Sequence, residues 1–86
     1  MGITLAMGEI TIGARIRAWR KYRRYSQREL AEAVGYDAAS LSLIENGKRK
    51  CYVVLAEACA AALEVDLPEF WGEVPDGPEP PPTVER

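Results

Sequence analysis

The residue types that usually carry catalysis are scarce in this chain of 86 residues. It has no histidine, and its two cysteines, Cys51 and Cys59, are too few to build a zinc site or a Cys/His nucleophile. The sequence also offers no glycine-rich phosphate loop and no carboxylate pair in an evident pocket. We therefore expect no enzymatic activity, no metal and no cofactor. Cys59 should pack in the core, and Cys51 should lie in a loop.

The side chains that do offer chemistry are arginines and lysines, whose cationic groups bind phosphate. Residues 13–50 carry ten basic and four acidic side chains, a local net charge of +6, although the whole chain has a formal net charge of −2. Residues 51–86 carry eight acids and a single base, Arg86, which gives −7. Since a charge acts over a Debye length of about 8 to 10 Å, the basic segment can attract a polyanion despite the acidic remainder.

Two short helical patterns lie inside this basic segment, and the first begins with a capping box. Ser26 is followed three residues later by Glu29, so a helix should begin at Gln27, and Gly35 should end it. Three residues at helical spacing would form its buried face: Leu30, Ala31 and Val34.

The second pattern follows directly after a short turn. Asp37 can cap it, Leu41 and Ile44 share its apolar face, and Asn46 with Gly47 should stop it. Four residues are left facing outward: Ala38, Ala39, Ser40 and Leu43. Two helices joined in this way place the second one in the DNA major groove, where its outward face meets the base edges.

Three more helices are predicted around this pair. One runs from Ile12 to Tyr22 with Thr11 as its cap, and another runs from about Val53 to Leu63. A third follows Asp66, which forms a box-like pattern with Glu69. Five helices in one short chain predict a compact all-α domain.

The two ends of the chain are not predicted to belong to the helical domain. Residues 72–86 contain five of the six prolines and predict a disordered or polyproline-like tail, with a polyproline ligand as the alternative. Residues 1–11 allow a dimerisation arm, a flexible leader or an upstream start before a native start at Met7; we favour a loosely packed leader. Because no apolar run approaches about 18 residues and no secretory signal is evident, we expect a soluble cytoplasmic protein with no membrane segment.

Residues 12–71 resemble the Cro and phage-repressor family of helix-turn-helix proteins, often called the xenobiotic-response-element type. The segments that carry the resemblance are IGARIRAWR, SQRELAEAVG, LSLIENGKRK and LAEACAAALEVDLPEFW. It implies a five-helix lambda-repressor-like bundle over residues 12–71, with the helix-turn-helix at about 26–45. It also implies a homodimer that binds an inverted repeat in double-stranded DNA and regulates transcription.

The resemblance implies roles for individual residues as well. Gln27 would touch the DNA backbone and brace the second helix of the motif. The residues at base-reading positions are Ala38, Ala39, Ser40 and Leu43, and only Ser40 among them can hydrogen-bond. Apart from the resemblance, Tyr36 and Asp37 at the start of this helix could reach a base or a phosphate. Three arginines could approach the DNA backbone or a minor groove: Arg23, Arg24 and Arg28. Phosphate anchors would follow the helix: Asn46, Lys48, Arg49 and Lys50. Direct base readout is therefore expected to be sparse.

Two further sets of residues have structural roles in similar proteins. Arg20 and Glu45 occupy the positions of a buried ion pair, whose loss strands one charge. The apolar end of the domain would supply a dimer contact made by Leu67, Phe70, Trp71 and Val74.

Two other functions remain open beside a repressor-like regulator. The chain could be an antitoxin that binds a toxin through its acidic tail, although PEPPPTVER offers only Val84 as an apolar anchor. It could also be the controller protein of a restriction-modification system. A protein partner would then be a toxin or a polymerase.

Overall fold

The computed structural model describes residues 10–77, which form five helices and no strand. The helices are α2 (Ile12–Tyr22), α3 (Gln27–Val34), α4 (Ala38–Glu45), α5 (Val53–Ala62) and α6 (Leu67–Trp71). The all-α prediction is confirmed, and the first three helices have the predicted bounds. Residues 1–9 of the predicted leader and most of the predicted tail lie outside the described residues.

The first two helices begin at the predicted side-chain caps. Thr11 Oγ1 accepts a hydrogen bond from the Ala14 amide at 3.0 Å. Ser26 and Glu29 form a complete capping box, in which each side chain bonds the other's backbone amide. Gly35 then ends α3 with φ at 79°, a left-handed conformation that favours glycine.

The caps of the later helices are weaker than the sequence suggests. Asp37 has the extended backbone of an N-cap, but its carboxylate makes no regular capping hydrogen bond. Asp66 also makes none, so the box-like pattern with Glu69 is not formed. These helices depend on packing instead, as short helices usually do.

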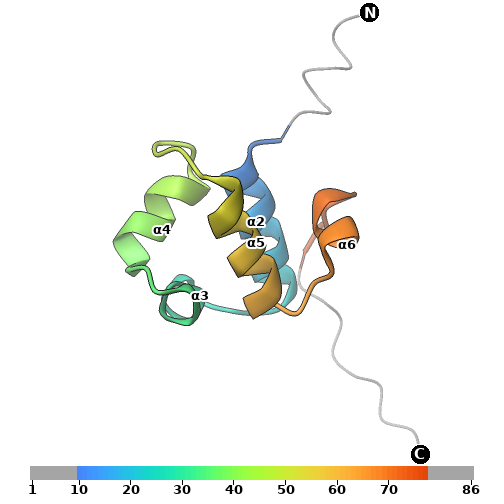
Figure 1. Cartoon of the computed structure of the whole chain (residues 1–86), viewed down its shortest axis with the longest axis horizontal. Helices are drawn as coiled ribbons and strands as arrows, with labels where there is room; N and C mark the ends of the chain where they lie inside the picture. Colours follow the sequence, from blue (N-terminus) through green and yellow to red (C-terminus); the bar gives the residue numbers. More distant parts are fainter. Residues whose placement is uncertain (1–9, 78–86) are drawn as a thin grey trace, which may run out of the picture.

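The core lies between α2 and α5, which pass side by side through the middle of the molecule (Figure 1). Fully buried side chains come from every helix and include Ile16, Leu30, Leu41, Cys59 and Phe70. The predictions of a buried Cys59 and of Cys51 in a loop are confirmed. α3 and α4 pack against one side of the central pair and α6 against the other (Figure 1).

Arg15 of α2 and Arg23, the C-cap residue of α2, bind backbone carbonyls at and just beyond the C-terminal ends of α6 and α5. Arg15 Nη1 donates to the carbonyls of Phe70 and Gly72 at 2.8 and 2.5 Å. Arg23 donates from Nε and Nη2 to the carbonyls of Leu63 and Glu64, both at 3.0 Å. Since helix ends leave carbonyls without partners, these contacts cap α6 and α5.

Within residues 10–77, no helix is long and apolar enough to cross a membrane. The same residues hold no group of three or more acidic, cysteine or histidine side chains that could bind a metal ion.

Candidate nucleic-acid interface

α4 presents one apolar side to the core and a second side to solvent. Leu41 and Ile44 are buried, whereas Ala39 and Leu43 are exposed and Ala38 and Ser40 are half-buried. The four residues predicted to face outward therefore share the solvent side. We call this surface the α4 face: Ala38, Ala39, Ser40 and Leu43.

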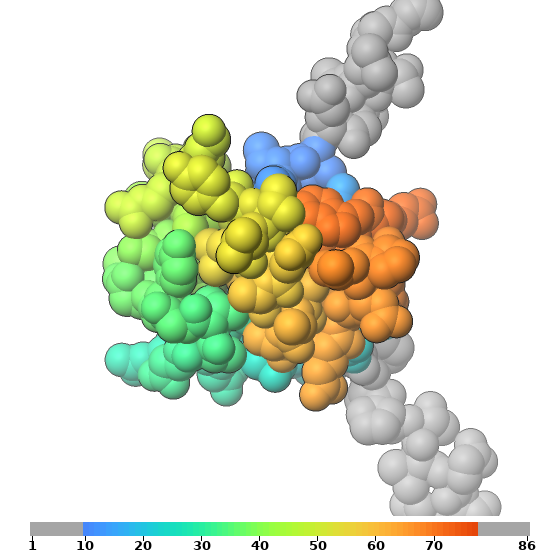
Figure 2. Space-filling model, in the orientation of Figure 1, coloured from blue at the N-terminus to red at the C-terminus, as the bar shows by residue number. Residues whose placement is uncertain are grey.

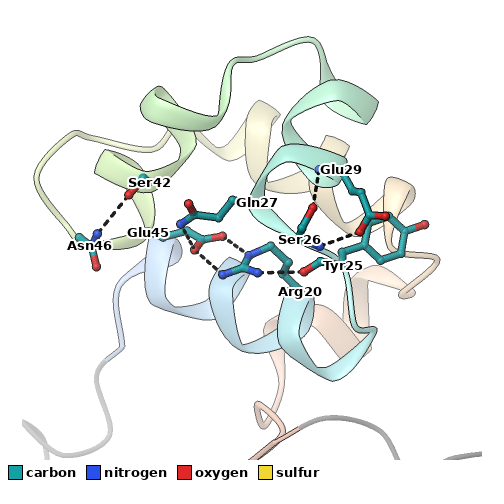
Figure 3. Close-up of polar contacts among 8 residues, drawn as sticks. All are labelled: Arg20, Tyr25, Ser26, Gln27, Glu29, Ser42, Glu45 and Asn46. Atoms are coloured by element: carbon teal, nitrogen blue, oxygen red, sulfur yellow. Dashed lines mark hydrogen bonds and ion pairs between the residues drawn. The ribbon is translucent and has the colours of Figure 1, made fainter.

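A buried ionic cluster fixes α4 against α2 and α3 (Figure 3). Arg20 of α2 donates from Nε and Nη2 to the two carboxylate oxygens of Glu45, at 2.7 and 3.0 Å. Gln27 of α3 donates its amide to the same carboxylate at 3.0 Å, and Arg20 Nη1 bonds the Tyr25 carbonyl at 2.9 Å. No buried polar side-chain atom in the described residues lacks a partner. The cluster links three helices and so sets the direction in which the α4 face points.

The turn after α4 brings a run of cations back toward that face. Gly47 has φ at 76°, and the Lys48 amide bonds the Leu43 carbonyl at 2.8 Å, which closes the helix and reverses the chain. Lys48, Arg49 and Lys50 are all exposed. Figure 2 shows this turn, in yellow-green, as a projection beside α4. We call residues 46–50 the basic turn.

The cations of the +6 segment divide into two groups. Arg15, Arg20 and Arg23 are committed to carbonyls or to Glu45 inside the domain. The sequence had placed Arg23 among the DNA-facing residues; its contacts with α5 are a role that spacing alone does not reveal. The exposed cations are Arg17, Lys21, Arg24, Arg28, Lys48, Arg49 and Lys50.

Other residues singled out in the sequence lie close to the α4 face. Tyr36 is exposed in the turn between α3 and α4, and Arg28 is exposed on α3. Arg28 and Tyr36 line one hollow with Asp37 and Ala38. Asn46 is exposed, and its amide lies 3.4 Å from the Ser42 hydroxyl (Figure 3). Tyr36 precedes α4 and Asn46 follows it, so polar side chains lie at both ends of the helix.

One residue that was predicted to make the dimer contact, Phe70, is buried in the domain. Phe70 has no exposed surface, because it fills the core beneath α2, so it cannot contact a second molecule. Leu67 and Trp71 are exposed by 41% and 38%, and Val74 is partly covered by the core. Trp71 also packs edge-to-face on Phe70 and beneath the Arg15 guanidinium.

A second apolar surface was not predicted. Tyr52, Val53 and Val54 are exposed by 67%, 51% and 78% at the start of α5. Its signal in the sequence is the near-continuous apolar run CYVVLAEACAAAL, since a helix that is apolar on every side needs partners on more than one side.

A family model described as a helix-turn-helix domain matches residues 11–70. The chain is also similar to the crystal structure of the restriction-modification controller protein C.AhdI from Aeromonas hydrophila, with 30% sequence identity and a TM-score of 0.63. That similarity covers 70% of this chain and 87% of the other. No curated protein matches the chain. The family match runs from the N-cap of α2 into α6.

Proposed function

The chain belongs to the helix-turn-helix domain family, and from this premise we propose that it is a homodimeric, repressor-like regulator that binds an inverted-repeat operator. A helix-turn-helix regulator binds double-stranded DNA. We propose in addition that this chain binds as a symmetric dimer, through the residues named below, and that it represses transcription. The observation that carries it is the exposed α4 face beside the basic turn, with the ionic cluster holding α4 in place. Residues 12–71 would form the DNA-binding domain.

The proposed contacts divide by chemistry. Ala38, Ala39 and Leu43 can pack on thymine methyl groups, and Ser40 can bond a base edge. Phosphate contacts are assigned to exposed cations and polar groups around α4: Arg24, Arg28, Lys48, Lys50, Asn46 and Gln27. Because phosphate contacts release counterions, the affinity for DNA should fall steeply as the salt concentration increases.

A substitution on the α4 face tests the assignment of DNA binding. Ala39→Asp adds a negative charge to an exposed position in the first turn of α4, where the helix dipole favours an acid. The domain should therefore stay folded while binding to a random-sequence duplex at low salt is lost, as measured by fluorescence anisotropy. Ala61→Asp makes the same change at an exposed position of α5 and should leave binding unchanged. Equal binding by both variants would refute the assignment.

We assign the homodimer contact to Leu67 and Trp71, because they are exposed apolar side chains of α6. α6 lies on the side of the domain away from α4 (Figure 2). A recognition helix alone covers half of a palindromic site, so a second copy is needed for an inverted repeat. Tyr36 and the α4 face would stay accessible in such a dimer.

A charge introduced into each of the two exposed apolar surfaces shows which of them makes the dimer contact. Leu67→Glu should convert the dimer into a monomer in sedimentation velocity, whereas Val54→Glu should leave the dimer intact. A monomeric Val54→Glu chain and a dimeric Leu67→Glu chain would show that the dimer contact lies at the start of α5. A monomeric parent chain, with and without operator, would reject the dimer altogether.

A more specific candidate role is control of a restriction-modification operon. The similarity to C.AhdI favours it, because that protein is a restriction-modification controller protein. The antitoxin alternative has no comparable support. A reporter driven by the chain's own upstream DNA would test the role: a repressor lowers its expression, and an activator raises it.

A further inference from the structure

The α4 face is poor in hydrogen-bonding groups, yet one cation of the basic turn reaches back over it. Arg49 Nη1 donates to the Ser40 hydroxyl at 3.0 Å, although the two residues are nine positions apart. Ser40 is the third residue of α4, so the Arg49 guanidinium lies along the first half of the helix and not at its end.

The backbone of the basic turn explains this placement. The left-handed Gly47 and the bond from the Lys48 amide to the Leu43 carbonyl turn the chain back beside α4. The neighbouring cation takes another direction, because the Lys50 amine lies 5.7 Å from the centre of the Tyr52 ring. Arg49 and Lys50 thus contact different groups, and of the two only Arg49 bonds a residue of the α4 face.

A third group joins the contact from the start of α4. The Ser40 hydroxyl, and to a smaller extent its amide and the Arg49 charge, hold the pKa of the Asp37 carboxyl below its ordinary value. Since Ser40 Oγ accepts a hydrogen bond from Arg49, its own proton is available to the Asp37 carboxylate. The Ser40 hydroxyl therefore interacts with both the Arg49 guanidinium and the Asp37 carboxyl.

We propose that Arg49 reads a base edge, most specifically a guanine, and that Ser40 positions it for this contact. The inference rests on the proposed operator binding. A guanidinium presents five donors in a rigid fork, and one donor spent on Ser40 leaves others for guanine O6 and N7. Arg49 thereby supplies the bidentate readout that Ala38, Ala39 and Leu43 lack. A lysine cannot reproduce the fork, although it keeps the charge.

The test is selection of bound sequences from a random duplex pool with the full chain and three variants. Arg49→Lys should keep the half-site spacing and the salt dependence but lose guanine preference at one position of each half-site, by roughly 5- to 100-fold. Ser40→Ala should weaken the preference at that same position by roughly a few-fold. Arg17→Lys, a matched change at an exposed arginine of α2 that has no assigned DNA contact, should leave the consensus unchanged.

The outcomes separate this inference from the function on which it rests. If the parent chain selects an inverted repeat and Arg49→Lys selects the same bases, Arg49 is a phosphate anchor and the inference is wrong. If Ser40→Ala alters a different position from Arg49→Lys, Ser40 reads its own base and does not position Arg49. If the parent selects no consensus, sequence-specific regulation fails together with base reading.

Discussion

Arg20 of α2 is joined to Glu45 at the end of α4 by two hydrogen bonds. Its side chain is 10% exposed and that of its partner Glu45 only 1%, so both charges are held away from water. A buried pair adds little net stability, but the removal of one partner leaves an uncompensated charge.

Arg20→Ala should therefore lower the free energy of unfolding by about 3 to 5 kcal/mol. The double variant Arg20→Met with Glu45→Leu should lose less unfolding free energy than Arg20→Ala, because it leaves no unpaired buried charge. Denaturant titration followed by circular dichroism measures both. An Arg20→Ala chain of unchanged stability that no longer binds DNA would show that Arg20 acts on DNA directly.

The buried Cys59 thiol should make the stability of the domain depend on pH in the alkaline range. Burial, with small contributions from Cys51 and Glu45, raises the pKa of the Cys59 thiol to about 12, from 9.0 for an ordinary cysteine. Between these values the unfolded chain loses the thiol proton and the folded chain keeps it. Stability should therefore fall as pH rises above about 9.

Urea titrations of the reduced chain at about pH 8 and about pH 10 measure this dependence. The loss of unfolding free energy between the two should be smaller in Cys59→Ala, whatever that variant's absolute stability. An equal loss in both chains would mean that other groups cause the alkaline dependence.

At the scale of the elements, α2 and α4 approach each other closely at Gly13. A Cβ built on Gly13 would overlap the carbonyl oxygen of Ile44 in the last turn of α4. The neighbour is backbone, which cannot move aside as a flexible side chain can. A glycine at this position is required by the distance between helices and not by its own φ.

Gly13→Ala should consequently destabilise the domain by about 1 to 3 kcal/mol, although alanine normally favours a helix over glycine. It should also weaken DNA binding, because α4 must shift. Thermal unfolding and fluorescence anisotropy measure the two effects. Gly77→Ala, where a Cβ meets nothing within 4 Å, is the control and should behave as the parent. A stable Gly13→Ala chain would contradict this contact.

The helices were predictable where local signals agree. Ser26, Glu29 and Gly35 mark the ends of α3 in the sequence, and they mark them in the structure for the same reasons. The roles of Arg15 and Arg23 were not predictable, because their carbonyl partners lie 40 to 57 positions away in the chain. Phe70 was misassigned to a surface, since a short apolar segment does not reveal which member faces inward.

On the scale of the whole molecule, the opposite charges of the two halves have a structural meaning. The exposed cations come from α2, the turn after it, α3 and the basic turn, whereas α6 and the residues after it contribute Glu69, Glu73 and Asp76. α4 and α6 lie on opposite sides of the central helices (Figure 1). We propose that a polyanion approaches the α4 side of the domain and that a second copy binds the α6 side.

Selection of bound duplexes by the parent chain at low and moderate salt tests the central claim most directly. A homodimeric helix-turn-helix regulator should enrich an inverted repeat whose half-sites lie about one turn of DNA, roughly 34 to 36 Å, apart. Its affinity for the selected site should fall steeply with salt. Failure to bind any duplex at low salt, or strong binding without a shared sequence, would contradict the account.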